Sequence, residues 1–586
     1  GPVTDRALFH CDNAYFWPAV KAVSAPLYTN TVSATAFRGF GGPQGMVGAE
    51  RVIEEVAFAT GLDPLEVRRK NFYGEPGRDV TPYHQTVEDN VAERVIAELE
   101  ESSGYTARRR EIAAFNAKSP VIKRGLALTP VKFGISFTAT HFNQAGALVH
   151  VYTDGSVHLN HGGTEMGQGL NTKVAQVVAH EFQVDFDAVK ITATTTGKVP
   201  NTSATAASSG TDLNGMAAQA AARTIKERMR VHLAEQHQCA PDSVTFTNGK
   251  VRAGSAVMSF AEAVKSCYFG RISLSATGFY ATPKIHWDKQ RSRGRPFFYY
   301  AYGAAVTEVA VDLLTGENRI LRTDILHDVG RSLNPAIDIG QIEGGFVQGA
   351  GWLTTEELVW DDAGRLRTHA PSTYKIPACA DRPGIFNVAL FGDGENIEDT
   401  IHKSKAVGEP PFMLKTTFTL PWMHSLRRLP QPPRPKLRRL KPQKLRPNPP
   451  RAETPVSENG QRSRFTFDLP DSNAALALAG EAESTLHRLE ALTGASLVLR
   501  GLQLVISGRP AQLERAAAVI ELVRPIWAEG QAVSSVDLQS ALAAIDSGRG
   551  ADHAAMGEQV LARSQAGSLL RPRTLRQKKY VDAMER

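Results

Sequence analysis

The segment covering residues 421–450 divides this chain into two parts and constrains its fold more than any other feature. Its thirty residues include nine prolines and nine lysines or arginines, but no acidic residue. Proline removes backbone donors and a high net charge opposes collapse, so we expect this segment to be extended and disordered. The chain is therefore expected to fold as separate globular regions before and after it.

Three interpretations of this basic segment remain open. It is a linker between domains, a nonspecific contact for a polyanion, or the product of a GC-rich coding sequence read out of frame. We prefer the linker or the frame artefact to a nucleic-acid-binding arm.

The composition of the whole chain is that of a globular protein. Its 586 residues are 42% hydrophobic and 22% charged, which suffices for several domains with their own cores. No apolar run approaches the roughly 18 residues needed to cross a bilayer. The N-terminal Gly-Pro-Val-Thr-Asp-Arg lacks the features of a secretory signal, so we expect a cytoplasmic protein.

Cysteines and histidines are both dispersed along the chain. No HExxH motif occurs, so we expect no side chain of this protein to ligate a metal. The cysteine spacing suits neither a metal knuckle nor a disulfide framework, which indicates a reducing compartment and predicts no iron–sulfur cluster in this chain. The four cysteines are Cys11, Cys239, Cys267 and Cys379.

The first region, residues 1–415, has the pattern of a mixed α/β fold. Alternating apolar residues on both sides of Asp154-Gly155 and of Thr315-Gly316 predict two hairpins. The predicted strands are residues 146–152 with 156–161, and 304–311 with 319–325. Helical spacing of apolar residues predicts helices over residues 51–71, 168–182 and 212–236.

Regular patterning returns at residue 464. The pattern predicts a strand, a helical stretch, a tight hairpin and a further helix, which together make a small α+β unit. These elements are residues 465–469, 473–493, 496–500 with 503–507, and 511–523.

Three loops rich in glycine or small residues could cradle an anion. Residues 38–44 read Arg-Gly-Phe-Gly-Gly-Pro-Gln, and residues 162–169 and 199–212 each precede a predicted helix, whose amides attract negative charge. Each loop alone is better explained as a capping turn. Walker A is absent, and residues 38–44 lack the third glycine of a dinucleotide-binding fingerprint. Several such loops together favour a large cofactor that carries a phosphate.

Residues 403–411 read Lys-Ser-Lys-Ala-Val-Gly-Glu-Pro-Pro and hold one carboxylate between a glycine and two prolines. Gly408 permits backbone angles closed to other residues, while Pro410 and Pro411 fix φ. Glu409 is therefore expected to be aimed rigidly, as a catalytic base must be. On local sequence alone, a turn with a solvated glutamate explains the same residues.

Taken in order, nine segments resemble the molybdenum-binding subunit of the xanthine dehydrogenase family of molybdenum hydroxylases. They include Thr-Ala-Phe-Arg-Gly-Phe-Gly-Gly-Pro-Gln at residues 35–44 and the Glu409 segment. The nine segments are residues 5–10, 35–44, 132–138, 143–147, 163–169, 324–330, 332–340, 371–377 and 403–411.

The resemblance implies an α+β fold built from mixed α/β molybdopterin-binding domains, and a molybdenum–molybdopterin cofactor. It implies oxidation of hypoxanthine or xanthine with oxygen from water, through attack by a molybdenum-bound hydroxide and hydride transfer. Iron–sulfur clusters and FAD are then expected on partner subunits or domains rather than in this chain.

The same resemblance assigns roles to individual residues. Glu409 matches the general base, and Arg6 matches the arginine that orients purines and stabilises developing negative charge. Phe40 and Phe137, with Thr138 beside them, match the positions that enclose the substrate. Further residues match positions that hold the pterin and its phosphate: Arg38, Met166, Gly167, Gln168, Ala207, Ser208, Thr211 and Gln341.

The chain departs from the family pattern in three places. The family carries a second active-site glutamate and a Gly-Gly-Gln pterin contact before the region that matches residue 1, and neither occurs in this sequence. Gly210 stands where some relatives have a hydroxyl residue. After Leu414 the expected C-terminal helix of the family gives way to the basic segment.

The region after residue 464 resembles the front of a PhoH-like ATPase, which begins with a KH-like domain. The resemblance rests on Phe-Thr-Phe-Asp-Leu-Pro-Asp at 465–471, the hairpin–helix unit, and Arg-Pro-Arg-Thr-Leu-Arg-Gln-Lys-Lys-Tyr-Val at 571–581. It implies possible RNA contact by residues 464–545 but no ATP hydrolysis, because Walker A is missing. Residues 480–483, Gly-Glu-Ala-Glu, also lack the second glycine of a GxxG loop.

These observations predict five regions. Residues 1–120 are the C-terminal part of a first molybdopterin-binding domain and 121–420 a second one. Residues 421–463 form the Pro/Arg-rich linker, 464–545 the KH-like domain and 546–586 a truncated start of the ATPase region. Besides the molybdenum hydroxylase, two alternatives remain: an RNA-associated module, or an inactive fusion of two truncated genes.

Overall fold

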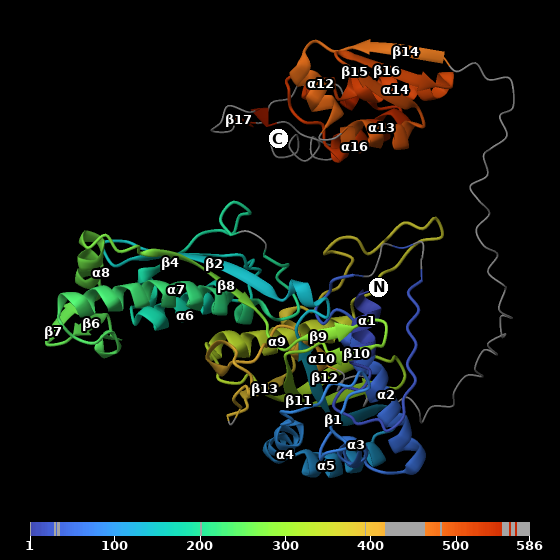
Figure 1. Cartoon of the computed structure of the whole chain (residues 1–586). Coiled ribbons are helices and arrows are strands. Elements are labelled where there is room, and N and C mark those ends of the chain that lie inside the picture. The colour runs from blue at the N-terminus through green and yellow to red at the C-terminus, as the bar shows by residue number, and fades with distance from the viewer. Residues whose placement is uncertain are drawn as a thin grey trace. The chain divides into compact units, whose positions relative to one another are not determined.

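The computed structural model describes residues 2–27, 31, 35–199, 202–392, 394–415, 463–480, 483–553, 562–563 and 569–570. These residues form two compact units, one that ends at residue 415 and one that begins at residue 463 (Figure 1). The basic segment at residues 421–450 and the motif at residues 571–581 lie outside the described residues.

A four-stranded sheet, named the central sheet below, forms the core of one half of the first unit (Figure 1). Its strands β1 and β11 pair antiparallel, β11 pairs antiparallel with β12, and β13 runs parallel to β12. Long stretches of β1 and β11 are buried at every position, which indicates that both faces of the sheet are covered. The strands are β1 (Ile122–Ile135), β11 (Tyr299–Asp312), β12 (Asn318–His327) and β13 (Ile385–Leu390).

Helices pack on both faces of this central sheet. Helices α4 (Ala92–Ser103) and α5 (Tyr105–Lys118) contact β1, β11 and β12 on one side (Figure 1). Helix α9 (Pro335–Trp352) packs against β13, and the short α10 (Pro410–Met413) packs against α9, β1 and β11. Glu409 immediately precedes α10, so the packing of α10 on the sheet fixes the position of this residue.

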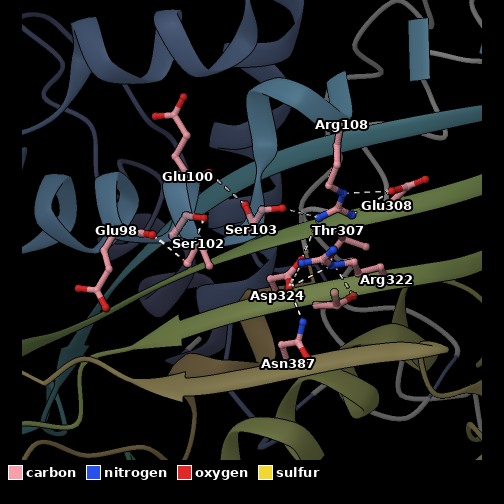
Figure 2. A network of polar contacts seen from close by, with 12 residues as sticks. Glu98, Glu100, Ser102, Ser103, Arg108, Thr307, Glu308, Arg322, Asp324 and Asn387 are labelled. Atoms are coloured by element: carbon pink, nitrogen blue, oxygen red, sulfur yellow. Dashed lines mark hydrogen bonds and ion pairs between the residues drawn. The ribbon is translucent and has the colours of Figure 1, made fainter. Parts of the chain in front are cut away.

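A network of charged side chains fixes α5 to the sheet (Figure 2). Arg108 of α5 donates to Glu308 of β11 at 2.9 Å and to Asp324 of β12 at 2.9 Å. Asp324 also accepts from Arg322 and from Asn387 of β13. Charges this far from water stabilise a fold only when each has partners, and here three strands and one helix supply them.

A second sheet forms the other half of this unit, in the order β4-β3-β2-β8. Helices α6 (Leu170–Phe182) and α7 (Gly210–Gln236) pack on it, and β2 alternates buried and half-buried residues (Figure 1). A small meander and α8 (Phe260–Phe269) extend the same core. The strands are β2 (Gln144–Val151), β3 (Val157–His161), β4 (Val189–Ile191), β8 (Ser275–Ala281), and β5 (Thr245–Thr247), β6 (Lys250–Ala253) and β7 (Ala256–Ser259) in the meander.

The N-terminal helices correct one expectation. Residues 51–71 do not form one helix, because α2 (Gly42–Thr60) ends at Gly61, which has a left-handed φ of 73°. Helix α3 (Pro64–Asn71) then begins with Asp63 capping the amide of Leu65. Helix α1 (Pro2–Phe9) packs on α2. Apolar periodicity continued across the break and concealed it.

The second unit is a small α+β fold, as predicted. Its antiparallel sheet has the order β14-β16-β15, and the helices pack around a core of alanine, leucine and valine. The expected helix over 473–493 is interrupted at Gly480, where φ is 73°. The main elements are β14 (Ser463–Asp468), α12 (Ser472–Ala479), α13 (Ser484–Thr493), β15 (Ser496–Arg500), β16 (Gln503–Gly508), α14 (Pro510–Leu522), α15 (Arg524–Trp527) and α16 (Ser535–Asp546).

The two predicted hairpins of the first unit and the hairpin of the second are confirmed by the strand pairings. The helices expected over 168–182 and 212–236 are confirmed as α6 and α7. Among the described residues, no helix combines the length and the apolar character needed to cross a membrane.

Candidate functional site

Glu409 is held by hydrogen bonds from two distant parts of the chain. Its Oε1 accepts from the amide of Gly39 at 3.1 Å, and its Oε2 accepts from the hydroxyl of Ser208 at 2.9 Å. The Glu409 amide in turn donates to the Ser208 Oγ at 2.8 Å. The carboxylate therefore has a fixed direction, and its role as a base stays a prediction.

The expected reason for the glycine beside it needs correction. Gly408 does not have a positive φ, so conformational freedom does not explain this residue. Instead, a Cβ at Gly408 would lie 3.1 Å from the Oγ of Ser208. Glycine allows the loop to approach the hydroxyl that holds Glu409, and Pro410 begins α10 at a position where no amide donor is needed.

Arg38 links the Glu409 loop to helix α9. Its Nε donates to the carbonyl oxygen of Gly408 at 2.6 Å, and its Nη2 donates to the backbone and side-chain oxygens of Gln341, each at 3.2 Å. Burial lowers the pKa of Arg38 to about 10, an effect that the charge of Glu409 opposes. Two residues expected to hold the cofactor are thus in direct contact, and one of them, Arg38, also bonds the loop of the expected base.

Three residues of the site have a left-handed backbone although none is glycine. The φ values are 51° for Phe40, 55° for Ala207 and 58° for Ser208. Such conformations are costly and are kept where the surrounding structure enforces them, often at functional sites. They lie in the two loops that supply hydrogen bonds to Glu409.

Arg6 is buried behind this site. Its Nη1 and Nη2 donate to the carbonyl oxygens of Ser136 and Gly134, each at 2.7 Å, and its guanidinium lies 4.9 Å from the ring centres of Phe133 and Phe297. Burial lowers the pKa of Arg6, and the charge of Glu409 partly opposes this. Arg6 therefore braces the segment that leads to Phe137, a role the sequence did not indicate.

His10 connects the backbone of Arg6 to strand β1. The amide of Gly134 donates to its Nε2 at 3.1 Å, so its Nδ1 carries the proton and donates to the carbonyl oxygen of Arg6 at 3.0 Å. The ring stacks on Phe133 with centres 4.5 Å apart. Burial, together with the charge of Arg6, holds the pKa of His10 well below its usual range, so the ring stays neutral.

Phe137 and Thr138 follow β1 on a turn. The amide of Phe137 donates to the side chain of Asn143 at 2.7 Å, and the Phe137 ring packs edge-on against Phe142, with centres 5.6 Å apart. Phe40 lies on the turn before α2, adjacent to Gly39. The enclosure of a substrate between Phe40 and Phe137 stays a prediction.

The glycine-rich loop before α6 binds a carboxylate of its own. Glu165 accepts from the amides of Gly167, Gly169 and Asn171 at 2.8, 3.0 and 2.9 Å. Partial burial would raise the pKa of Glu165, but these backbone bonds outweigh it and lower the pKa. The loop thus does stabilise an anion, although the anion here belongs to the chain itself. Met166 on the same loop is 66% exposed.

The loops before α6 and α7 contact each other, and the first of them lies against the start of α9. The amide of Thr164 donates to Thr205 at 2.8 Å, and a Cβ at Gly169 would lie 2.8 Å from Ile337 of α9. The Oγ1 of Thr202 and the Oδ1 of Asn214 are buried and lack a hydrogen-bond partner within the described part of the chain. Unpaired polar atoms beside exposed glycine-rich backbone suit a polar ligand with many acceptors and donors.

This arrangement fits a pterin cofactor with a phosphate. The residues expected to hold it come from the three loops and α9, and two of them, Arg38 and Ser208, contact the Glu409 loop directly. They are Arg38, Met166, Gly167, Gln168, Ala207, Ser208, Thr211 and Gln341. Ser208 differs from the expectation in one respect, because its hydroxyl is already engaged by Glu409.

Lys405 is a site residue that sequence reasoning missed. Its ammonium group is fully buried and donates to Asp328 at 2.6 Å and to Asp89 at 2.5 Å. Its amide donates to the carbonyl oxygen of Val329 at 2.7 Å. Its place in Lys-Ser-Lys-Ala-Val at residues 403–407 does not distinguish it from the half-buried Lys403 two positions earlier. This residue anchors the loop four positions before Glu409.

A separate depression of about 590 Å³ lies at the C-terminal end of α7 and contains none of these residues. There His232 approaches the Oγ of Ser266 at 3.3 Å, but Ser266 donates to Gln236. The serine hydroxyl therefore accepts from His232 and is not activated as a nucleophile. No cluster of three or more histidine, cysteine or acidic side chains suited to a metal occurs among the residues that the structure describes.

Comparison with protein-family models gives two matches within the first unit. Residues 1–72 and 98–383 each match a family described as a molybdopterin cofactor-binding domain. Both matches include residues of the Glu409 site, Arg38 in the first and Ser208 and Gln341 in the second.

Among curated proteins, the chain is 49% identical over 416 residues to xanthine dehydrogenase/oxidase of Felis catus, covering 71% of this chain and 30% of that protein. It is 46% identical over 422 residues to xanthine dehydrogenase 1 of Arabidopsis thaliana, covering 71% of this chain and 29% of that protein. The chain therefore spans less than a third of the length of these relatives.

Solved structures share the fold. Quinoline 2-oxidoreductase from Pseudomonas putida 86 aligns with a TM-score of 0.61 at 23% identity, over 72% of this chain and 54% of that chain. Aldehyde oxidoreductase from Desulfovibrio gigas aligns with a TM-score of 0.60 at 22% identity, over 72% of this chain and 43% of that chain.

Proposed function

We propose that this chain, whose residues 1 to about 415 belong to the molybdopterin-binding region of the xanthine dehydrogenase family, takes part in the oxidation of hypoxanthine and xanthine with oxygen from water. The observation that carries this proposal is the Glu409 carboxylate, fixed by Ser208 and Gly39 and bordered by the Arg38–Gln341 contact. A carboxylate held in one direction next to residues expected to bind the cofactor is what a general base for the water-derived oxygen requires.

The cofactor would be held by Arg38, Gln341 and the loops before α6 and α7. When bound, molybdenum–molybdopterin supplies the water-derived oxygen and accepts the electrons of the oxidised purine. Glycine-rich backbone binds phosphate without a charged side chain, but the amides of Gly167, Gly169 and Asn171 would bind the phosphate only after the Glu165 carboxylate has left them.

The residues of this chain would divide the remaining work. Glu409 would accept the proton of the water-derived oxygen as this oxygen attacks the ring carbon. Because the carboxylate is already held in one direction, little conformational entropy is lost in reaching that geometry. Arg6 supplies positive charge close to Glu409, where it favours negative charge developing on the purine. Phe40 and Phe137, with Thr138, would enclose the flat ring between apolar faces.

The test is oxidation of hypoxanthine by the protein purified with its natural partner chains. Glu409→Gln is expected to lower the rate by about 10² to 10⁴, because a general base contributes that much. Glu395→Gln, which alters an exposed carboxylate a short distance before it, is the matched control and should leave the rate unchanged. A Glu409→Gln protein that oxidises hypoxanthine at the original rate would contradict the proposal.

A second candidate function belongs to residues 464–545. Their order β14-α12-α13-β15-β16-α14, with a three-stranded antiparallel sheet, supports a KH-like module with RNA contact. The test is binding of single-stranded RNA by the full chain and by a chain lacking residues 421–450. RNA binding that survives the deletion supports the module, whereas loss would mean that the basic segment bound RNA through charge alone.

The assembly and location remain part of the proposal. We expect partner subunits or domains that carry iron–sulfur clusters and FAD, and a cytoplasmic enzyme. We also retain the division into molybdopterin-binding domains at residues 120 and 121. The third possibility, an inactive fusion, predicts that the purified protein contains no molybdenum and forms no urate.

A further inference from the structure

We propose that Tyr299 and Asp212 are positioning residues that hold Glu409 in its functional direction. The inference rests on the proposed function, because it takes Glu409 to be the base. It adds two residues whose side chains bond each other rather than Glu409.

Tyr299 joins two segments through a single hydroxyl group. Its Oη accepts from the amide of Ala406 at 2.9 Å and donates to the Oδ2 of Asp212 at 2.7 Å. Tyr299 is 4% exposed and Asp212 is 6% exposed, so water does not compete for these bonds. The hydroxyl thus donates its proton to Asp212 and accepts a hydrogen bond from Ala406, which fixes its orientation.

Both contacts of Tyr299 lead to Glu409 along short stretches of chain. Ala406 lies three residues before Glu409, within the loop that Lys405 anchors. Asp212 lies in the first turn of α7, four residues after Ser208, whose hydroxyl bonds the Glu409 carboxylate. Tyr299 therefore ties together the loop that carries the base and the loop that aims it.

The surroundings of Tyr299 keep its hydroxyl as the donor to Asp212 and the acceptor from Ala406. Burial raises the pKa of Tyr299 well above its usual value, so the hydroxyl keeps its proton. Lys173 of α6 lies near Asp212 but forms its own ion pair with Asp338. Asp212 is therefore left to the Tyr299 hydroxyl.

The next residue of the strand provides a matched control. Tyr300 is also 4% exposed, and its hydroxyl bonds that of Tyr83 at 2.9 Å. Successive side chains of a strand point to opposite faces, and the two tyrosines belong to different core clusters. Tyr299→Phe and Tyr300→Phe remove the same atom from adjacent positions, but only the first breaks the link to Glu409.

The test is hydrogen–deuterium exchange of the full chain, followed by mass spectrometry of peptides that cover residues 404–415 and 205–213. Tyr299→Phe is expected to speed exchange in both peptides about tenfold, because a buried amide loses its acceptor and the two loops separate. Tyr300→Phe should leave both peptides unchanged. Equal effects of the two variants, or no effect of Tyr299→Phe, would overturn the inference.

Substitutions at position 212 separate positioning from packing. Asp212→Asn keeps an oxygen that accepts from Tyr299, so exchange in both peptides should stay near the original rate. Asp212→Ala removes the acceptor and should reproduce the effect of Tyr299→Phe. If Asn and Ala behave alike, the bond to Tyr299 is not what holds the loops.

A kinetic readout on the assembled enzyme completes the test. Tyr299→Phe should lower kcat for hypoxanthine about tenfold with little change in KM, because the substrate walls are intact and only the base is displaced. A change confined to KM would contradict positioning of Glu409. The two proposals fail separately, because unchanged activity of Glu409→Gln would remove the proposed function while the exchange results would still decide whether Tyr299 holds these loops.

Discussion

The hydroxyl of Ser208 and the residue Glu409 form a reciprocal pair, in which Ser208 donates to the carboxylate at 2.9 Å and accepts the Glu409 amide at 2.8 Å. One serine therefore controls both the backbone and the side chain of the expected base. The two residues are 201 positions apart in the chain. Their contact defines the site more directly than any local motif.

Removing this hydroxyl should impair the reaction without unfolding the protein. Ser208→Ala removes one of the two hydrogen bonds to the carboxylate and leaves only that from Gly39, and we expect kcat for hypoxanthine to fall about 10- to 100-fold. The control is Ser209→Ala, since the Ser209 hydroxyl bonds only the carbonyl oxygen of Ala206. Steady-state kinetics of the two variants should therefore differ, and equal rates would show that Ser208 does not control the base.

Lys405 should contribute strongly to the free energy of unfolding, because its buried ammonium group pairs with two carboxylates that would otherwise repel each other. Lys405→Met leaves Asp328 and Asp89 without their shared cation, and we expect the free energy of unfolding to fall by about 3–5 kcal/mol. Lys403→Met changes a half-exposed lysine of the same loop and should cost less than about 1 kcal/mol. Denaturant unfolding of both variants gives the comparison, and equal losses would contradict the assignment.

Arg108 tests the network between α5 and the central sheet (Figure 2). Arg108→Met should lower the free energy of unfolding by about 2–4 kcal/mol, less than at Lys405 because Arg322 still pairs with Asp324. Arg110→Met, at an exposed position of the same helix, is the control and should change stability by less than about 0.5 kcal/mol. A small effect of Arg108→Met would mean that apolar packing alone holds α5.

Asp212 predicts a specific dependence of stability on pH. Burial raises its pKa from 3.8 to about 7, opposed by the bond from Tyr299 and the charge of Lys173. The folded state therefore binds this proton more tightly than the unfolded state. Its stabilising contribution is complete below the unfolded value and is lost as the pH rises through about 7.

Compared with Asp212→Asn, the unsubstituted chain should lose about 3 kcal/mol of stability between pH 5 and pH 8. Urea midpoints at several pH values measure this difference. Asp187→Asn, an exposed carboxylate after α6, serves as the control. Parallel pH profiles for the chain and its Asp212→Asn variant would show that the buried carboxyl is not protonated near neutrality.

Much of the local structure could be predicted because its causes are local. The Asp154-Gly155 and Thr315-Gly316 turns between alternating residues specify hairpins, and both occur. The break at Gly61 was missed because the apolar spacing of α2 continues into α3. Gly61 is the signal for this boundary, because glycine with a left-handed φ commonly ends a helix.

The site could be predicted only in part, because its defining contacts join distant residues. The motif around Glu409 indicated a rigid carboxylate, but the rigidity comes from Ser208, Gly39 and the Arg38 contact to Gly408 rather than from glycine freedom. Arg6 was expected at the substrate, whereas its visible bonds brace the strand before Phe137. No periodicity or turn pattern encodes such contacts.

The most direct test of the account is the molybdenum and pterin content of the protein purified with its natural partners. We predict both in equal amounts, and a loss of at least about tenfold in Arg38→Met, which removes the charged contacts to Gln341 and Gly408. A purified protein without molybdenum and pterin, or an Arg38→Met protein that retains both in full, would contradict the central claim that these loops form a molybdopterin site.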